Sequence, residues 1–284
     1  MTSVFPQDLH KNIAKKISLI YSLEESDSLA YLLLENLYDL TKTQVLLNSK
    51  KAVALEILDE PLDRLLKNEP IQHILCEAEF YGRKYRVNKN TLVPRQETEE
   101  LVRLIVAEND IDSPYVLDIG TGSGCIAISL ALEIPTTKVS AIDVSPEALS
   151  KAQQNAQLLG AQINFQRLDV RTEWEPQKLC DIIVSNPPYV LESEKKEMHK
   201  NVLEFDPHLA LFVTDSDPLV FYKAIAKKAS KFLNLQGKLY VEINEQFGKE
   251  VSKLFTFYSF ENVRIIQDLN GKDRFVSGQL NKNK

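Results

Sequence analysis

The sequence predicts an α/β fold, with a doubly wound, mostly parallel sheet that follows a small helical bundle. From about residue 114 onward, short apolar segments alternate with amphipathic helical segments, which is the order of strands and helices in a parallel sheet. Residues 1–76 instead carry apolar residues at helical spacing. Between them, residues 77–93 are rich in aromatic residues around a glycine turn, as in a β-hairpin. We therefore expect a helical domain over 1–76, a hairpin linker over 77–93 and a sheet domain over 94–284.

Three apolar series define the expected helical bundle. The members of each series recur at helical spacing, which is typical of an amphipathic helix. Polar stretches at 24–27 and 41–43 interrupt the series and are expected to be turns or caps. The bundle is either a packing unit or a surface for a macromolecular substrate, and the pattern leaves both open. The series are Leu9, Ile13, Ile17 and Ile20; Leu29, Leu32, Leu33, Leu37 and Leu40; and Val53, Ile57, Leu62, Leu65 and Leu66.

The remaining elements follow from apolar runs and their boundaries. Ser145, Pro146 and Gly160 stand where a helix has its N-cap, its first residue and its C-terminal glycine. The Asn270-Gly271 turn favours an antiparallel hairpin at the end of the sheet, and the tail over 281–284 is expected to be frayed. Strands are predicted over 115–119, 138–143, 163–168, 181–185, 238–243, 263–267 and 274–279, and helices over 97–108, 123–133, 146–159 and 218–233.

Composition narrows the classes of function. The net charge of −6 and the pI of about 5.4 disfavour nucleic acid as a partner, because such binding usually needs a basic face. No apolar run approaches the ~18 residues that span a bilayer, and the N-terminus lacks the features of a signal peptide. Three widely separated cysteines suggest reduced thiols and a cytoplasmic protein. The four histidines show no metal-ligand spacing, so no metal site is predicted. A monomer is the simplest expectation.

A glycine-rich loop follows the first predicted strand. Glycines there let the backbone approach a ligand closely. The spacing is G-x-G-x-G, whereas the dinucleotide loop has G-x-G-x-x-G. Asp118 directly precedes the loop, and its carboxylate suits a ligand with an ammonium group, such as the amino-acid part of methionine. The loop residues expected to bind the cofactor are Gly120, Thr121, Gly122, Ser123 and Gly124.

Acidic residues end the next two strands. Asp143 stands where an acid binds ribose hydroxyls. Asp169 stands where an adenine edge would lie, with Val170 beside it. Together with the loop and Asp118, these residues indicate S-adenosyl-L-methionine as the cofactor. A nicotinamide cofactor is the main alternative, but it predicts the longer glycine spacing and leaves the motif described next unexplained.

The motif Asn186-Pro187-Pro188-Tyr189 follows the fourth strand, 181–185. It lies at the carboxyl end of a strand, where open α/β sheets place their ligands. Prolines cannot continue the ladder, and they stiffen the backbone. Rigid acceptors beside an aromatic ring suit a planar NH2 group, although a simple strand terminator is the alternative interpretation. We predict that all four residues bind the substrate, that Asn186 also borders the cofactor, and that Asn186, Pro187 and Tyr189 are catalytic.

These segments together resemble the PrmC/HemK class of glutamine-N5 methyltransferases. Residues 118–128 resemble its cofactor loop, and Asn186–Tyr189 matches its N-P-P-Y motif. That motif alone is shared with DNA adenine and guanine methyltransferases, whereas the combination is far more specific. The sequence departs from the family pattern at Gln96, Cys76 and Asp206. Further similar segments are 68–75, 93–99, 205–211, 268–274 and, more loosely, 242–248.

The resemblance implies a Rossmann-like class I methyltransferase sheet, with the N-terminal helical domain recognising the substrate. It implies methyl transfer to the N5 amide nitrogen of the glutamine in the Gly-Gly-Gln motif of peptide chain release factors. A nucleic-acid amino-methyltransferase acting on adenine N6 or guanine N2 is the alternative, because the motif also suits the NH2 group of a flipped base. Such an enzyme should show a basic face, and this chain is acidic. A silent binding module is a third interpretation, against which the intact Asn186 argues.

Five further residues carry weaker expectations. Arg95 and Glu97 are expected to form a structural salt bridge at a helix start, and Trp174 to be a packing or surface aromatic. Asp206 and His208 suit either the substrate entrance or a purely structural loop.

Overall fold

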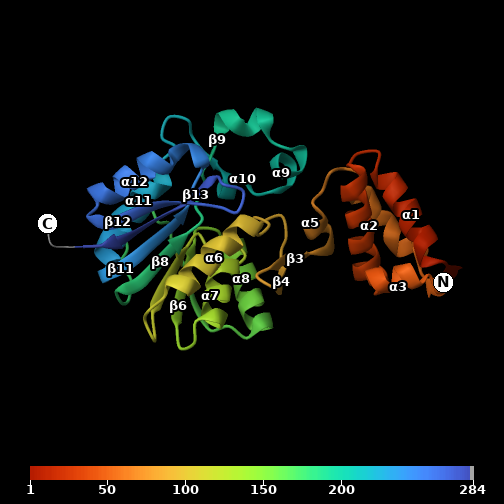
Figure 1. The fold of residues 1–284 in the computed structure, drawn as a ribbon, viewed down its shortest axis with the longest axis horizontal. Coiled ribbons are helices and arrows are strands. Elements are labelled where there is room, and N and C mark those ends of the chain that lie inside the picture. Colours follow the sequence, from red (N-terminus) through yellow and green to blue (C-terminus); the bar gives the residue numbers. More distant parts are fainter. Residues whose placement is uncertain (282–284) are drawn as a thin grey trace. The chain divides into compact units, whose positions relative to one another are not determined.

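The computed structural model describes residues 1–281, which form two compact units (Figure 1). The first contains Met1–Glu77 and His199–Phe205, and the second contains Ala78–Met198 and the chain from Asp206 onward. Of the tail expected to be frayed, Asn281 donates its backbone N–H to Ser259, and residues 282–284 lie outside the described part. No helix within residues 1–281 is long and apolar enough to span a membrane.

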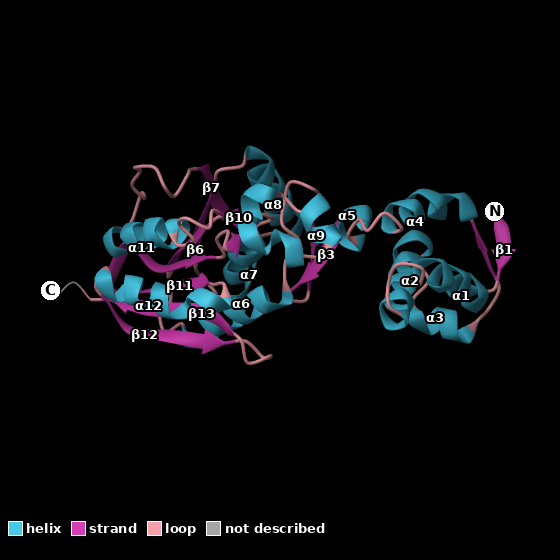
Figure 2. Ribbon diagram, turned by 90° about the horizontal axis from the view of Figure 1, so that it is seen from above, coloured by secondary structure: helices cyan, strands magenta, loops and turns pink. Residues whose placement is uncertain are grey.

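The first unit is a helical bundle with one short pair of antiparallel strands (Figure 2). Its apolar core contains residues of all three predicted series, among them Ile13, Leu33 and Leu65. Its strands are β1 (Thr2–Val4) and β2 (Lys51–Val53), and its helices are α1 (Pro6–Ile17), α2 (Leu23–Tyr38), α3 (Lys42–Leu47), η1 (Leu55–Leu58), α4 (Asp59–Leu65), α5 (Ile71–Leu75) and α9 (Lys200–Phe205).

Two expectations for this unit need correction. Residues 24–27 are not a turn but the first turn of α2, because Ser22 is the N-cap and accepts the Glu25 N–H. The acids there suit the positive end of the helix dipole. Three members of the apolar series, Ile20, Leu32 and Ile57, are exposed, since they lie at the edge of the buried face or beyond a helix end. Thr41 caps α3 with a capping box, as expected.

A β-hairpin begins the second unit. Strands β3 (Glu77–Phe80) and β4 (Arg83–Arg86) pair around Tyr81 and Gly82. Both turn residues have positive φ, 50° and 69°, which matches the twist of a tight hairpin. Phe80 and Tyr85 are fully buried and pack edge to face, so the hairpin shares the core of the unit that follows.

The second unit is built on a seven-stranded sheet of order β12-β13-β11-β8-β5-β6-β7. Neighbouring strands from β11 to β7 are parallel, and β13 pairs antiparallel with β11 and β12. This confirms the mostly parallel sheet with an antiparallel hairpin at its end. The strands are β5 (Tyr115–Ile119), β6 (Lys138–Asp143), β7 (Ile163–Arg167), β8 (Cys180–Ser185), β11 (Leu233–Glu242), β12 (Phe260–Gln267) and β13 (Asp273–Leu280).

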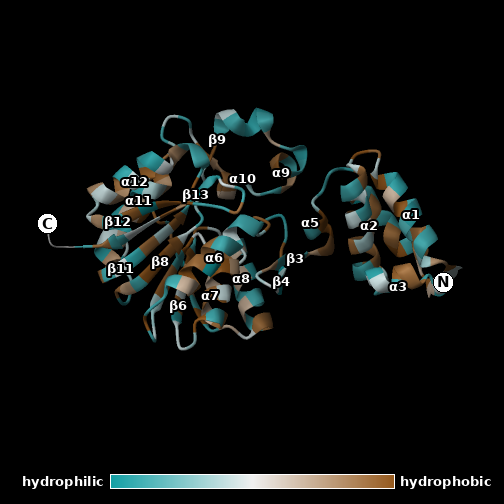
Figure 3. Ribbon diagram, viewed as in Figure 1, coloured by the Kyte–Doolittle hydropathy of each residue, from teal (hydrophilic) through white to brown (hydrophobic). Residues whose placement is uncertain are grey.

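Helices cover both faces of this sheet and enclose one apolar core on each side (Figure 1). One core joins the sheet to α11 (Val220–Phe232) and α12 (Gly248–Phe257). The other joins it to α6 (Gln96–Glu108), α7 (Cys125–Glu133) and α8 (Pro146–Leu159). The central strands are hydrophobic along most of their length, as Figure 3 shows for β8, because a parallel strand is buried on both faces.

Several elements were not expected from the sequence. Helix α12 is amphipathic, with Val251 and Phe255 buried, but its apolar residues are few and the polar segment before it obscured its start. Between β8 and α11 the chain forms only short elements: β9 (Val190–Leu191), η2 (Glu192–Glu197), α9, α10 (His208–Leu211) and β10 (Phe212–Val213). A further short helix, η3 (Glu245–Phe247), precedes α12.

Candidate active site

The glycine loop and the Asn-Pro-Pro-Tyr motif leave the sheet side by side. Strand β5 lies between β6 and β8, so the chain order reverses there, which is where open α/β sheets bind ligands. Ile119 and Ser185, the last residues of β5 and β8, are register partners. The Ser185 hydroxyl also donates to the Ile119 carbonyl at 2.7 Å. The glycine loop and the Asn-Pro-Pro-Tyr motif therefore start from two adjacent, hydrogen-bonded residues.

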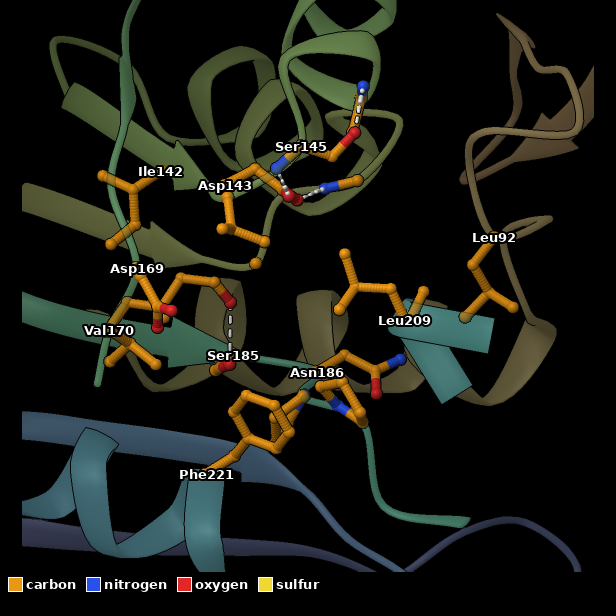
Figure 4. Close-up of a pocket in the computed structure, with 18 of the residues that line it drawn as sticks. Leu92, Ile142, Asp143, Ser145, Asp169, Val170, Ser185, Asn186, Leu209 and Phe221 are labelled. Atoms are coloured by element: carbon orange, nitrogen blue, oxygen red, sulfur yellow. Dashed lines mark hydrogen bonds between the residues drawn. The ribbon is translucent and has the colours of Figure 1, made fainter. Parts of the chain in front are cut away.

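A cavity opens above these strand ends (Figure 4). Its lining comes from the ends of β5, β6 and β8, the segment after β7, the loop before α6, and helices α10 and α11. Figure 4 shows Asp143 and Ser145 facing Asn186 across the cavity, with Val170 and Phe221 at one end and Leu92 and Leu209 at the other. Predicted site residues that line it are Gly120, Gly122, Asp143, Asp169, Val170, Asn186, Pro187 and Pro188.

The glycine loop is tied to the end of β6 and to α8. Gly120 and Thr121 donate to the Ile142 carbonyl at 2.9 and 3.0 Å. Gly122 donates to one oxygen of Asp143 at 2.9 Å, and Ser145 donates to the other at 2.9 Å. Burial raises the pKa of Asp143, and these backbone N–H groups oppose the rise. Each Asp143 oxygen keeps a lone pair for another donor, which fits the hydroxyl pair expected there.

Asp118 lies fully buried below the loop. Its Oδ2 accepts the Thr121 hydroxyl at 2.6 Å, whereas Oδ1 has no hydrogen-bond partner within residues 1–281. Burial raises the pKa of this carboxyl to about 7. An uncommitted buried acceptor beneath a glycine loop fits a ligand that carries an ammonium group, because an unpaired buried carboxylate is otherwise costly. The residues present therefore suit the predicted cofactor.

The Asp169 carboxylate already forms an ion pair with a neighbouring residue. It forms a two-pronged ion pair with Arg171, whose shortest contact is 2.7 Å, and this holds the pKa of Asp169 below its usual range. The Arg171 guanidinium lies 5.5 Å from the centre of the Phe221 ring. This end of the cavity thus combines a charged edge with an aromatic face and the apolar Val170.

Asn186 is held by a chain of hydrogen bonds that ends on a buried glutamate. Its Nδ2 donates to the Thr98 hydroxyl at 3.2 Å, and that hydroxyl donates to Glu242 at 2.7 Å. The Tyr189 hydroxyl donates to the other Glu242 oxygen at 3.0 Å. Burial raises the pKa of Glu242, against these two hydrogen bonds and the nearby Arg274. The Tyr189 ring packs against the apolar core that contains α11.

Five predicted site residues are not among those that line the cavity: Asp118, Thr121, Ser123, Gly124 and Tyr189. The first four form or support the loop from behind. Asn155, for example, is fully buried and donates to the Ser123 carbonyl at 2.8 Å. Their roles toward ligands stay predictions, as does the packing of the Tyr189 ring on a substrate amide.

Sequence reasoning missed part of the lining and the residues behind Asn186. Leu92, Leu209 and Phe221 line the cavity, but on the sequence they look like ordinary core residues. Thr98 and Glu242 lie in two segments that resemble the family pattern, so the resemblance pointed to the segments without giving these side chains a role. Their contact joins residues 144 positions apart, which no local pattern reveals.

The structure also shows the contacts of the residues for which the sequence predicted no clear role in the chemistry. The expected ion pair of Arg95 with Glu97 at the helix start is wrong: Arg95 pairs instead with the buried Asp206 at 2.6 Å, which joins the start of α6 to a distant loop. Trp174 packs on Phe232 at 5.0 Å between ring centres, as expected of a packing aromatic. His208 contacts Phe212 edge to face, beside the lining residues Pro207 and Leu209. In the described part of the chain, no group of three or more His, Cys, Asp or Glu side chains has the arrangement of a metal site.

Comparison with known sequences adds two family models and close relatives. Residues 97–205 match the model described as "Methyltransferase small domain", and residues 17–75 match "PrmC N-terminal domain". A release factor glutamine methyltransferase of Flavobacterium psychrophilum is 45% identical over 267 residues, covering 92% of this chain and 94% of that protein. One from Bacteroides thetaiotaomicron is 51% identical over 221 residues, covering 78% of this chain and 79% of that protein.

Comparison with solved structures supports the fold. A methyltransferase from Pyrococcus furiosus superposes with a TM-score of 0.53 at 16% sequence identity, over 78% of this chain and 98% of that protein. At this identity the likeness concerns the fold alone.

Proposed function

The chain belongs to the family of release factor glutamine methyltransferases, and from that premise we propose that it methylates the side-chain amide nitrogen of a release factor glutamine. The glutamine is that of the Gly-Gly-Gln motif, and the methyl donor is S-adenosyl-L-methionine. The observation that carries the proposal is the pairing of Ile119 with Ser185, since it sets the glycine loop directly beside Asn186. The reaction joins the amide nitrogen to the methyl carbon, releases the thioether and frees one amide proton.

The cofactor supplies an electrophilic methyl group on a sulfonium. We assign Asp143 to the ribose hydroxyls and the loop from Gly120 to Gly124 to the amino-acid part, with Asp118, which lies behind the loop, as the negative charge that favours its ammonium. The orphaned Oδ1 of Asp118 and the free lone pairs of Asp143 support this assignment. Val170 and Phe221 offer apolar surface for a planar base at the end near Asp169.

A side-chain amide is a poor nucleophile, because its nitrogen lone pair is delocalised. We assign the Asn186 Oδ1 and the Pro187 carbonyl as acceptors of the two substrate N–H groups. Both bonds would orient the lone pair and stabilise the positive charge that grows on nitrogen. Two prolines keep these acceptors rigid. This division of labour requires no His or Cys side chain.

The first unit, in this proposal, binds the body of the release factor. Its core is separate from the cores of the second unit, so it can present a surface without altering the cavity. We expect the protein to act as a monomer in the cytoplasm, where its protein substrate is found. All three cysteines are free thiols, which suits that compartment.

One experiment tests the proposed function. The protein is incubated with methyl-labelled S-adenosyl-L-methionine and, separately, a release factor, its Gly-Gly-Ala variant, DNA and RNA. Label in the wild-type release factor alone is the expected result. Label in nucleic acid would favour the adenine or guanine amino-methyltransferase, and absence of label from every substrate would favour a silent binding module.

A further inference from the structure

We propose that Thr98 and Glu242 are positioning residues that fix which end of the Asn186 side chain faces the substrate. The inference rests on the proposed function, in which the Asn186 oxygen accepts from the substrate amide. It concerns the hydrogen-bond chain from Asn186 through Thr98 to Glu242, whose two links are 3.2 and 2.7 Å long.

The number of protons available on the two hydroxyls fixes the direction of these hydrogen bonds. Glu242 accepts the Tyr189 hydroxyl on one oxygen and the Thr98 hydroxyl on the other. A hydroxyl has one proton to donate, and Thr98 donates its proton to Glu242. Toward Asn186, Thr98 therefore acts only as an acceptor, so it must face the NH2 end of the amide. No hydrogen bond from residues 1–281 occupies the Asn186 oxygen, which is left as the acceptor for a ligand.

The chain has a rigid anchor. Glu242 ends β11 and is 1% exposed, and Thr98 is 2% exposed. The backbone carbonyl of Glu242 accepts the buried Tyr222 hydroxyl at 3.2 Å, and the next residue, Ile243, donates to the Arg274 carbonyl at 2.9 Å. The Glu242 carboxylate is thus fixed relative to the sheet. It holds the Thr98 hydroxyl, and that hydroxyl in turn holds the Asn186 side chain.

Burial and the nearby Glu97 carboxylate raise the pKa of Glu242, and the hydrogen-bond donors and the positive charge around it oppose them and favour the ionised form that this scheme needs. Two hydroxyl donors meet the carboxylate, and the Arg274 guanidinium adds positive charge nearby. Arg274 is itself held at 3.1 Å by Asp268, whose side chain is fully buried. A carboxylate that only accepts makes the direction of both hydroxyls unique, whereas a protonated acid would allow Thr98 to donate to Asn186 and turn the amide around.

The test is steady-state kinetics of Thr98→Val, Thr98→Ser and Glu242→Gln on a release factor. Valine keeps the shape of threonine but removes the hydroxyl, so kcat is expected to fall by about 10- to 100-fold, with the Kd for S-adenosyl-L-methionine within twofold of wild type. Serine restores the hydroxyl and is expected to keep at least half of the wild-type kcat. Glu242→Gln keeps one acceptor oxygen and replaces the other by an NH2 donor, so one of the two hydroxyls loses its acceptor and kcat is expected to fall by about 10-fold or more.

A double-mutant comparison separates positioning from general damage. If Thr98 acts through Asn186, Thr98→Val is expected to cause no further loss in an Asn186→Ala background. Ser129→Ala is the matched control, because it removes another fully buried hydroxyl that bonds a side chain, Tyr85, outside the cavity. Its kcat is expected to equal that of wild type.

Two kinds of failure are distinguishable. If wild-type protein methylates the release factor but Thr98→Val has normal kcat, or lowers it equally with and without Asn186, the positioning role is overturned while the function stands. If wild-type protein transfers no methyl group to the release factor, the proposed function fails and the inference falls with it.

Discussion

At the scale of single residues, the site depends on which polar atoms already take part in hydrogen bonds or ion pairs within the protein. Asp169 is fully engaged by Arg171, whereas Asp118 keeps one buried oxygen without a partner in the described chain. The Asn186 NH2 group donates to Thr98, whereas its oxygen accepts no hydrogen bond from residues 1–281. Atoms left over after the internal hydrogen bonds are those with which a ligand can pair, and both residues lead to predictions.

Replacing Asn186 should abolish most of the methyl-transfer activity but change the affinity for the cofactor little. Asn186→Ala removes the proposed acceptor of the substrate N–H, so kcat is expected to fall by about 100-fold or more. Isothermal titration of S-adenosyl-L-methionine should give a Kd within about threefold of wild type. Near-normal turnover of the variant on a release factor would contradict the proposed role.

The raised pKa of Asp118 predicts how stability depends on pH. In the unfolded chain the carboxyl loses its proton near pH 4, whereas in the folded protein it keeps the proton until about pH 7. Between these values only the unfolded state has lost the proton. The free energy of unfolding of the ligand-free protein should therefore fall as pH rises from about 4 to about 7, by a few kcal/mol, and then level off.

Urea denaturation between pH 4.5 and 8 measures this slope. Asp143 and Glu242 also have raised pKa values, so they act in the same direction, and Asp118→Asn should flatten the curve only in part. The acids with lowered pKa values, such as Glu108, act at lower pH. A wild-type stability that rises across this range, or an unchanged slope in Asp118→Asn, would contradict the assignment.

At the scale of elements, the sequence predicted best where local signals agree. Strands β5 and β6 and helix α8 have the predicted bounds, because apolar runs and the Ser145, Pro146 and Gly160 boundaries coincide. Helix α12 was missed because its apolar face is short. The link from Thr98 to Glu242 was also beyond prediction, since side chains so far apart in sequence meet only through the sheet.

The glycine loop gives a prediction about element packing. A Cβ on Gly124 would lie 3.0 Å from the Ile128 Cδ1 and 3.1 Å from the Ala152 Cβ, and its φ is +84°. Gly124→Ala thus combines backbone strain with a clash between α7 and α8, and it should cost about 2–4 kcal/mol of unfolding free energy.

Gly160→Ala is the matched control. Its φ is +74°, but nothing lies within 4 Å of the added Cβ, so only the strain of about 1 kcal/mol is expected. Urea denaturation of the two variants compares the losses directly. Equal losses would show that Ile128 and Ala152 make room for the added Cβ, and would contradict the predicted clash.

At the scale of the whole molecule, two units with separate cores divide the work in our proposal. The cavity and all predicted site residues belong to the second unit. In the first unit, Leu19 and Ile20 in the turn after α1 and Leu23 at the first position of α2 are exposed, Leu19 by 83% and Leu23 by 80%. Clustered exposed apolar side chains are typical of surfaces that bind proteins.

The double substitution Leu19→Ser and Leu23→Ser tests whether the first unit binds the release factor. Removing both side chains should weaken docking by about 1–2 kcal/mol, which raises KM for the release factor roughly 5- to 30-fold. The kcat and the Kd for S-adenosyl-L-methionine should stay within twofold, because neither residue lies in the second unit. Leu235→Ser with Phe257→Ser is the control on the second unit, where these side chains are 62% and 79% exposed. An equal rise in KM for both pairs would mean a non-specific loss of apolar contact, and no rise for Leu19 and Leu23 would remove this turn from the docking surface.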